Sequence, residues 1–351
     1  MKRFLGIALA LFTLFSISSC APRDPASRVG KEVEKLAASY GFEGVIAVWR
    51  DGKPLVSFAK GRLPDGSAVT FDSAMPVGSV SKQFCAAAVL LLQDQGKLKI
   101  TDTLDKFYPS YAEGSKVSLK HLLSMRSGLT DLVSEAGLAS LSPDRTEAEN
   151  VAAMKEWLFS QPLAYKPGAF YMYCNSNFFL LADIVEQVSG EKYIDFLRKN
   201  VFSPLGMSHT GTFGDPVRFF GDMPGDPTGA FAFLDEQPGI VKGAGDLVSD
   251  AEDIRLWLEA LTGGKLLSEE SYRAMTTDYS PEGNSYGFGA RMDFGSETGH
   301  FGGVGHYGTI GIYSAFDYRC EEKDLTIFIV SNSIDPGSIN EFSEAVAALL
   351  P

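Results

Sequence analysis

The chain has few of the residues that build metal centres or disulfide frameworks. Its 351 residues include four cysteines and four histidines, with no Cys-x-x-Cys pair and no histidine-rich segment. Because the histidines are scattered, we expect no metal site and no cofactor. Three cysteines remain beyond Cys20, namely Cys85, Cys174 and Cys320. An odd number leaves at least one thiol free or bridged to another molecule.

Basic residues are also scarce. The 31 lysines and arginines face 44 acidic residues. Loss of an N-terminal signal carrying Lys2 and Arg3 would leave 29 basic residues and a net charge of −15. This balance argues against a nucleic-acid partner and against adhesion to anionic lipid by charge alone. Hydrophobic residues make up 45% of the chain, enough for a sizeable core.

The N-terminus reads as a secretory signal. Lys2 and Arg3 precede an apolar run from Phe4 to Phe15, which is too short to remain in a membrane as a span. The sequence Ile17-Ser-Ser-Cys20 resembles a bacterial lipobox, which implies cleavage before Cys20 and lipid on its sulfur; the alternative is an ordinary signal peptide cut nearby. We expect a signal peptide over 1–19, a tether over 20–27, and an exported protein anchored to a bacterial membrane through Cys20.

Strand patterns occur near both ends of the remaining chain, and helix patterns fill the middle. Residues 44–50 and 54–60 predict a hairpin around Asp51-Gly52. Further strands are predicted at 287–292, 304–316 and 325–332, with a turn at 317–324. The expected helices are 27–40, 80–95, 117–125, 146–160, 175–189, 193–201, 250–261, 268–275 and 338–350. The irregular stretch 211–242 is expected to border a binding site.

Strands at the two ends are expected to pair with each other, because unpaired edges are a liability. This gives an α+β fold with an antiparallel sheet built from both chain ends, flanked by terminal helices, and an inserted mainly helical subdomain. We assign residues 28–351 to one catalytic domain, with a sheet half at about 28–78 and 285–351 and a helical half at about 79–284. A cleft between the halves is the expected site.

Ser79 and Lys82 stand at the start of the most apolar helix, 80–95. A hydroxyl there lies among free backbone N–H groups at the positive end of the helix dipole. Lys82 is one turn later on the same face and can take the serine proton if it is kept neutral. The alternative is a helix cap beside a surface charge. A second Ser-x-x-Lys copy, Ser57 to Lys60, lies in a predicted strand whose residues i and i+3 face opposite sides, and we exclude it.

Tyr173 and Asn175 stand in a short loop before the apolar helix 175–189. Tyr173 beside Lys82 would form a coupled pair, with the tyrosine partly ionised and acting as base to Ser79 or as acid to a leaving group. Asn175 could bind a substrate carbonyl or hold Lys82. The alternative is that Tyr173 packs and Asn175 caps its helix.

The segment Gly305-His306-Tyr-Gly308-Thr309 opens a predicted strand. Glycines there let a ligand approach the backbone closely. The N–H groups of Thr309 and Ser79 would form an oxyanion hole. His306 would supply a polar or cationic contact to substrate, or else be a hydrogen-bonded structural histidine.

Together these residues resemble the three motifs of the serine β-lactamase and penicillin-binding family. Ser79-Val-Ser-Lys82 is similar to its Ser-x-x-Lys, Tyr173-Cys-Asn175 to its Tyr-x-Asn, and His306-Tyr-Gly308 to its His/Lys-x-Gly. The nearest branch contains class C β-lactamases, D-alanyl-D-alanine carboxypeptidases and esterases, and the likeness runs in order over about 40–335. Further matching segments are Leu122-Leu123, Ser127-Gly128-Leu129, Lys166-Pro-Gly168, Pro204 to Met207, Gly243 to Gly245 and Ser249 to Asp253.

The resemblance implies roles for these residues. Ser79 would be the acylated nucleophile, and Lys82 and Tyr173 would share the general-base and general-acid roles. Asn175 would touch the substrate amide, and His306 with Gly308 and Thr309 would line the site on the facing strand.

Three features depart from the family pattern. Met125 and Arg126 stand where the family usually has a histidine, Cys174 fills the middle of the second motif, and His300-Phe-Gly302 rivals His306 for the third. A Cys85–Cys174 bridge is conceivable, but we expect these cysteines to be packed.

The resemblance implies an exported serine hydrolase that works through an acyl-Ser79 intermediate on a D-amino-acid peptide, ester or β-lactam. Histidine in the third motif, where efficient class C β-lactamases carry lysine, favours a peptidase or esterase. The alternative is a lipid-anchored penicillin-binding sensor, or a catalytically silent binding protein on the same fold. The expected partners are a small molecule or a peptidoglycan-like peptide, and we expect a monomer.

Overall fold

The computed structural model describes residues 25–63, 66–213, 215, 233–234, 236–280, 283–292, 294, 302–335 and 337–351. The expected signal peptide, Cys20 and His300 lie outside the described residues. The first helix, α1 (Pro25–Ser39), begins inside the segment that we assigned to a tether. Within the described part of the chain, no helix combines the length and apolarity that crossing a membrane requires.

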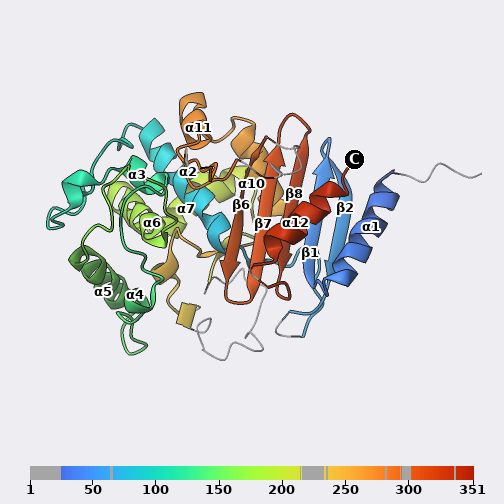
Figure 1. Cartoon of the computed structure of the whole chain (residues 1–351), viewed down its shortest axis with the longest axis horizontal. Coiled ribbons are helices and arrows are strands. Elements are labelled where there is room, and N and C mark those ends of the chain that lie inside the picture. Colours follow the sequence, from blue (N-terminus) through green and yellow to red (C-terminus); the bar gives the residue numbers. More distant parts are fainter. Residues whose placement is uncertain are drawn as a thin grey trace, which may run out of the picture.

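A five-stranded antiparallel sheet joins the two ends of the chain (Figure 1). Its order is β2-β1-β8-β7-β6. The bounds are β1 (Gly44–Arg50), β2 (Lys53–Lys60), β6 (Val304–Ile310), β7 (Tyr313–Cys320) and β8 (Leu325–Ser331). The N-terminal β1 pairs with the C-terminal β8, from Gly44 opposite Ser331 to Arg50 opposite Leu325. The expected α+β fold is therefore confirmed.

Both faces of the sheet are covered by helices, because its central strands are apolar on both sides. Along β1, Val45 and Ala47 face the larger core, whereas Ile46 and Val48 face the smaller one. The smaller core lies under α1 and the C-terminal α12 (Ile339–Ala348), which cross one face of the sheet in Figure 1. On the opposite face α10 (Ala251–Thr262) packs against β7 and β8, although its residues fall within the expected helical half.

The predicted strands of the C-terminal part were wrong in two places. Residues 304–316 form parts of two strands, because Gly311 adopts a φ of 55° and turns the chain into a hairpin between Ile310 and Tyr313. The segment that we predicted as a turn, 317–324, is strand as far as Cys320, where Tyr318 and Cys320 are buried. Residues 287–292 form no strand and make only the isolated bridges of Tyr286 and Arg291.

The helical half, at the left of Figure 1, contains most of the predicted helices. Their bounds are α2 (Ser81–Asp94), α3 (Leu119–Leu123), α4 (Glu135–Leu138), α5 (Glu147–Ser160), α6 (Asn175–Ser189), α7 (Tyr193–Leu197), α8 (Ser203–Leu205) and α11 (Glu269–Met275). The expected helix 193–201 changes to a π-helical turn at Arg198–Phe202 before α8. Short strands β3 (Met75–Pro76), β4 (Gly211–Thr212) and β5 (Leu247–Ser249) form a second sheet.

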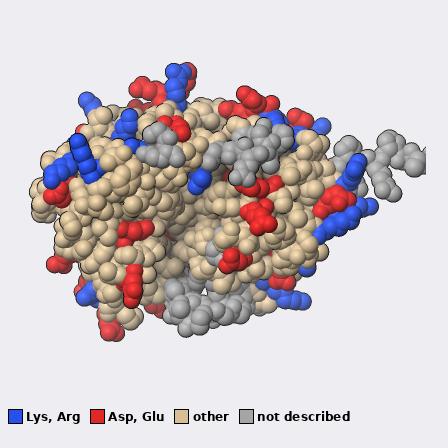
Figure 2. Space-filling model, in the orientation of Figure 1, with Lys and Arg blue, Asp and Glu red and all other residues tan. Residues whose placement is uncertain are grey.

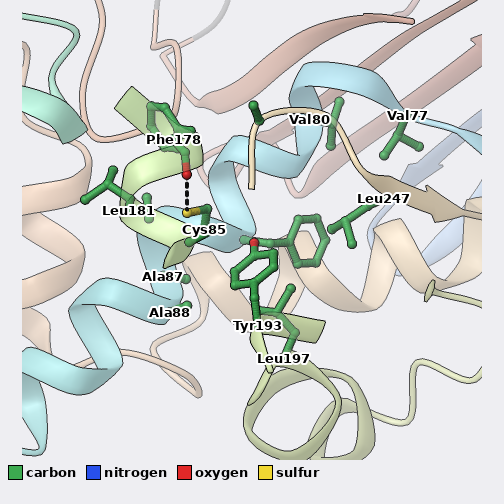
Figure 3. Close-up of a cluster of buried hydrophobic side chains, with 14 of the residues drawn as sticks. Val77, Val80, Cys85, Ala87, Ala88, Phe178, Leu181, Tyr193, Leu197 and Leu247 are labelled. Carbon is green, nitrogen blue, oxygen red and sulfur yellow. Dashed lines mark hydrogen bonds between the residues drawn. The ribbon is translucent and has the colours of Figure 1, made fainter. Parts of the chain in front are cut away.

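Helix α2 occupies the centre of the molecule. Most of its side chains are buried, and it packs against α6, α7 and α11. In Figure 3, Cys85 on α2 faces the carbonyl oxygen of Phe178 on α6, with its sulfur 3.7 Å from that oxygen. Leu181 on α6 and Tyr193 on α7 complete this contact region (Figure 3). The dense packing fixes the first turn of α2, where Lys82 stands, relative to the start of α6, where Asn175 stands.

Candidate active site

Ser79 and Lys82 come together where the chain enters α2. Ser79 lies in a 3-10 turn, η1 (Gly78–Val80), directly before the helix. The Nζ atom of Lys82 is 2.9 Å from the Ser79 Oγ. Ser79 is partly exposed, whereas the Lys82 side chain is completely buried. The structure thus gives a reachable hydroxyl and a shielded amine in direct contact, which is the arrangement that an activated serine requires.

Burial lowers the pKa of Lys82 to about 7, because a charged ammonium loses its hydration in the interior. The carboxylate of Asp131 opposes this shift without cancelling it. Near neutral pH, about half of the Lys82 side chains are therefore uncharged.

The other two contacts of Lys82 agree with an uncharged amine. Its Nζ is 2.9 Å from the Asn175 Oδ1 and 2.6 Å from the Ala244 carbonyl oxygen. A neutral amine has two N–H donors and one lone pair, and these two oxygens accept both donors. The lone pair is left for the proton of Ser79. The three contacts therefore place the lysine as a base toward the serine.

Asn175 is held so that its oxygen faces Lys82. Its Nδ2 donates to the Asp131 Oδ2 over 3.1 Å, which fixes the orientation of the amide. Asp131 in turn accepts a hydrogen bond from the backbone N–H of Val133. Of the two roles that the sequence left open for Asn175, holding Lys82 is the one seen in the structure. Asp131 was not anticipated, although it follows the matching segment Ser127-Gly128-Leu129 by two residues.

Tyr173 stands beside both residues of the first motif. It makes a hydrogen bond with Ser79, and the Lys82 Nζ lies 4.9 Å from the centre of its ring. The residue is 37% exposed, but its hydroxyl, which meets Ser79, is shielded, so burial governs its titration. Burial raises the Tyr173 pKa, with a smaller opposing effect from Ser79. The expectation of a partly ionised tyrosine is therefore not supported, and Tyr173 is a proton donor at neutral pH.

The strand β6 lies against η1 at the open edge of the main sheet. A Cβ atom on Gly308 would lie 1.9 Å from the Val77 carbonyl oxygen and 3.0 Å from the Ser79 nitrogen. Any side chain at 308 would therefore push the strand away from the nucleophile. This contact explains why glycine is needed in the third motif.

The backbone of Thr309 is placed to serve an oxyanion hole. In β6, Gly305 exchanges backbone hydrogen bonds with Arg291 on the side away from β7. Backbone groups alternate in direction along a strand, and the register with β7 is continuous, so Thr309 also directs its N–H to that side. The Thr309 nitrogen is 2.6 Å from where a Cβ on Gly78 would stand, next to Ser79.

His306 is a buried neutral histidine. Its Nδ1 donates to the Tyr307 carbonyl oxygen, and its Nε2 accepts from the Tyr286 hydroxyl over 3.1 Å. Burial, with a smaller effect from nearby Lys82, lowers the His306 pKa to about 3. Of the expected polar or cationic contact, the structure supports the polar form only. His306 also lines the cavity beside Ser79, so it belongs to the site as well as to the core.

A buried polar chain behind the site was missed in the sequence. The carboxylate of Asp317 on β7 accepts hydrogen bonds from the Gln83 Nε2 at 2.7 and 2.9 Å and from the His306 backbone N–H at 2.7 Å. Gln83 in turn accepts from the Trp257 indole N–H. Asp317 therefore links the helix carrying Lys82 to the strand carrying His306. The pairing of 306 with 317 depends on the hairpin turn at Gly311, which the sequence pattern did not reveal.

Two departures from the family pattern have structural substitutes. The Met125 sulfur lies 3.3 Å from the Cys174 backbone nitrogen and 3.2 Å from the Asn177 Nδ2. Arg126 donates to the carbonyl oxygens of Gly168 and Tyr279. The pair thus fixes the loop that presents Tyr173, in place of the usual histidine.

The segment supplying Ala244 is anchored by buried charges. Lys242 contacts Asp183 over 3.1 Å and also Glu186, both on α6. The anchored segment presents the Ala244 carbonyl to Lys82.

The catalytic residues open into a cavity of about 680 Å³. Its polar wall contains Ser79, Tyr173, Asn175, Arg291 and His306. The opposite wall is apolar and includes residues from 233–241, inside the irregular stretch that was expected to border a site. Arg291, which sequence reasoning missed, brings a cation to the polar wall.

The cysteines are packed, as expected. Cys85, Cys174 and Cys320 are buried free thiols. Within the described ranges, no three His, Cys, Asp or Glu side chains form a group able to hold a metal ion.

Comparison with known proteins covers nearly the whole folded part. The family model described as beta-lactamase matches residues 29–349. PbpX of Bacillus subtilis (strain 168), named as a candidate penicillin-binding protein, is 28% identical over 277 residues, covering 77% of this chain and 67% of PbpX. A D-aminopeptidase from Brucella anthropi is 32% identical over 183 residues, covering 51% of this chain and 34% of that protein. The aligned part is thus about a third of the D-aminopeptidase's length.

The solved structures agree on the fold. D-amino acid amidase from Ochrobactrum anthropi SV3, complexed with L-phenylalanine, aligns with a TM-score of 0.74 at 22% identity. The alignment covers 92% of this chain and 98% of that one.

Proposed function

The chain belongs to the beta-lactamase family and is a serine hydrolase, and we propose that it hydrolyses amides, peptides or esters of D-amino acids through an acyl ester on Ser79. The observation that carries this proposal is the contact of 2.9 Å between the Ser79 Oγ and a fully buried Lys82. Burial keeps much of the lysine uncharged, and its two carbonyl contacts leave the lone pair for the serine proton.

Acylation follows from this geometry. The Ser79 Oγ attacks the substrate carbonyl carbon while its proton passes to Lys82. The negative charge that develops on the carbonyl oxygen is held by the backbone N–H groups of Ser79 and Thr309. Tyr173, which remains protonated and bonded to Ser79, gives its proton to the leaving group and regains one from Lys82. The products are the free leaving group and an acyl ester on Ser79.

Deacylation uses the same groups in reverse. A water molecule enters where the leaving group stood and loses a proton to the base formed by Lys82 and Tyr173. The oxyanion forms again in the same backbone hole, and collapse of the tetrahedral species breaks the ester bond to Ser79. The acid is released, and the serine regains its proton.

The substrate class rests on relatives and on one side chain. Relatives named D-aminopeptidase are 32 and 34% identical over about half of this chain. A neutral His306 stands where efficient class C β-lactamases carry lysine, so the site lacks that cation next to the nucleophile. These observations support amide or ester hydrolysis over efficient β-lactam turnover.

A test compares D- and L-amino-acid amides with the purified protein. We expect the D-enantiomers to be hydrolysed at least tenfold faster, and Ser79→Ala to abolish turnover without loss of the folded circular dichroism spectrum. Ser57→Ala is the matched control, because Ser57 begins the second Ser-x-x-Lys copy and is exposed on β2. Full activity in Ser79→Ala would overturn the proposal. A penicillin adduct that persists for hours would instead favour the sensor.

We propose export and lipid anchoring from the N-terminal sequence alone. Cys20→Ser is expected to move the protein from the membrane fraction to the soluble exported fraction and to remove the lipid mass from the N-terminal peptide. Equal membrane association of both forms would contradict anchoring through Cys20. We also propose that the protein is a monomer, which light scattering on the detergent-free Cys20→Ser variant would test.

A further inference from the structure

The cavity beside Ser79 has walls of two different kinds. Near the nucleophile stand the hydroxyl of Tyr173, the imidazole of His306 and the guanidinium of Arg291. Beyond Asn175 the wall is entirely aliphatic, formed by Val133, Leu138, Leu141, Ile240 and Val241. We refer to these five residues as the aliphatic hollow.

Exposed apolar side chains gather around this cavity. The described residues include five large hydrophobic side chains that are more than a third exposed, namely Val133, Leu138, Phe170, Met172 and Tyr173. All five fall in two segments, 133–138 and 170–173, and each segment contributes to the cavity wall. Val133 is 51% exposed and Leu138 47% exposed. Exposed apolar groups concentrated at one place are typical of a surface that binds an apolar ligand group.

The space behind the hollow is also apolar. A smaller cavity of about 30 Å³ continues inward from the same five residues and adds Leu132, Met154 and Phe179 to the wall. Asn175 lines both cavities and marks the boundary between the aliphatic side and the catalytic side. In Figure 2, the surface between the helical half and the sheet is largely uncharged. A methyl side chain would leave most of this space empty.

The position of Tyr173 decides which part of the substrate reaches the hollow. The Tyr173 ring lies 6.2 Å from the His306 ring and 6.3 Å from the Tyr286 ring, on the polar side of Ser79. A leaving group that receives the Tyr173 proton departs on that side. The acyl group, which remains on Ser79, then extends past Asn175 toward the aliphatic side.

We infer that the aliphatic hollow binds the side chain of the acyl residue and selects bulky apolar acyl groups, either aromatic or branched aliphatic, over alanine. This inference rests on the proposed function, since it names the acyl group that the same nucleophile accepts. An apolar pocket discriminates by about 10- to 200-fold for each methylene that it buries or leaves out. The protein is accordingly specific for D-amino-acid derivatives with large apolar side chains.

The test varies the acyl group while the leaving group stays constant. With ammonia as leaving group, we expect kcat/KM for D-phenylalanine amide and D-leucine amide to exceed that for D-alanine amide by at least about tenfold. With nitrophenol as leaving group, hexanoyl and phenylacetyl esters are expected to exceed the acetyl ester after correction for spontaneous hydrolysis. The ester series reports on the hollow whether or not D-amino-acid amides are substrates.

Variants at the mouth of the hollow complete the test. Val133→Ser and Leu138→Ser change exposed side chains, so both proteins are expected to fold, and the double variant should lower the bulky-to-small ratio at least fivefold in both series. Ala139→Ser is the matched control, because Ala139 is an exposed neighbour that does not line the cavity, and its ratios should equal those of the unchanged protein.

The outcomes separate the inference from the proposed function. Equal rates for small and bulky acyl groups, or ratios unchanged in the double variant, overturn the inference and leave the serine mechanism intact. Bulky esters preferred but no amide cleaved would support the hollow and overturn the D-amino-acid assignment. Failure to cleave any ester or amide would overturn both.

Discussion

Replacing Lys82 by methionine should make the free energy of unfolding depend on pH in a particular way. Burial lowers the Lys82 pKa from 10.5 to about 7. Each pH unit between these values corresponds to about 1.4 kcal/mol, so a protonated Lys82 destabilises the folded state by about 5 kcal/mol. Methionine has similar length and no charge, and it removes this cost.

The sign follows from proton binding. Below pH 7 the lysine is protonated in both the folded and the unfolded chain, so the full cost is present. Between pH 7 and 10.5 the unfolded chain binds a proton that the folded chain does not, and the stability of the unchanged protein rises with pH. The variant lacks this rise. Its stability relative to the unchanged protein should therefore be greatest at low pH and should fall by about 3 kcal/mol between pH 6 and pH 9.

Lost contacts set the level of this curve but leave its slope unchanged. Methionine gives up the contacts with Ser79, Asn175 and Ala244, at about 1 kcal/mol each. We therefore expect the variant to be more stable than the unchanged protein at pH 6 by about 2 kcal/mol and less stable at pH 9 by about 1 kcal/mol, although it is inactive.

Urea unfolding at pH 6, 7.5 and 9, followed by tryptophan fluorescence, measures this difference. Lys60→Met is the control, because Lys60 is exposed at the end of β2, and its difference from the unchanged protein should stay nearly constant with pH. A Lys82→Met difference that also stays constant, or that grows with pH, would refute the assignment of Lys82 as a buried, largely neutral base.

Three further predictions concern the pH profile, β6 and the buried polar chain. Because the Lys82 pKa is about 7 and that of His306 about 3, kcat/KM should fall about tenfold per pH unit below pH 7, and His306→Gln should lower the rate but keep this limb; loss of the limb would assign it to the histidine. Gly308→Ala should reduce kcat/KM by about 100-fold or more while the fold persists, because its Cβ would displace β6 from the turn at Ser79; near-normal rates would contradict the close contact. Asp317→Asn, which turns a donor toward Gln83, should cost about 1–3 kcal/mol of stability in denaturant unfolding, and an unchanged midpoint would show that the carboxylate is not the required acceptor.

Much of the fold could be predicted because its signals are local. The apolar run of α2, the helix 175–189 and the Asp51-Gly52 hairpin each carry their own periodicity or turn residues. The pairing of β1 with β8 followed from the need to hide strand edges. The hairpin at Gly311 was missed because apolar residues continue on both sides of it, and a single glycine within a β-rich run does not distinguish a bulge from a turn.

The catalytic residues were also visible in the sequence, because each stands at the start of a helix or strand. The structure brings Ser79, Lys82, Tyr173, Asn175 and His306 to one cavity, and Thr309 to its edge. Residues that act through these groups were not visible. Asp131, Asp317 and Ala244 meet their partners over long sequence separations, and nothing in the local pattern marks them. The charge of His306 likewise depends on burial, which only the assembled site reveals.

The most direct test of the account is intact-protein mass spectrometry after rapid acid quenching of a reaction with a D-amino-acid ester, followed by peptide mapping. The account predicts a transient mass increase equal to the acyl group, located on the peptide that contains Ser79 and absent from the Ser79→Ala protein. Turnover without any acylated species, or an acyl group on another residue, would contradict it.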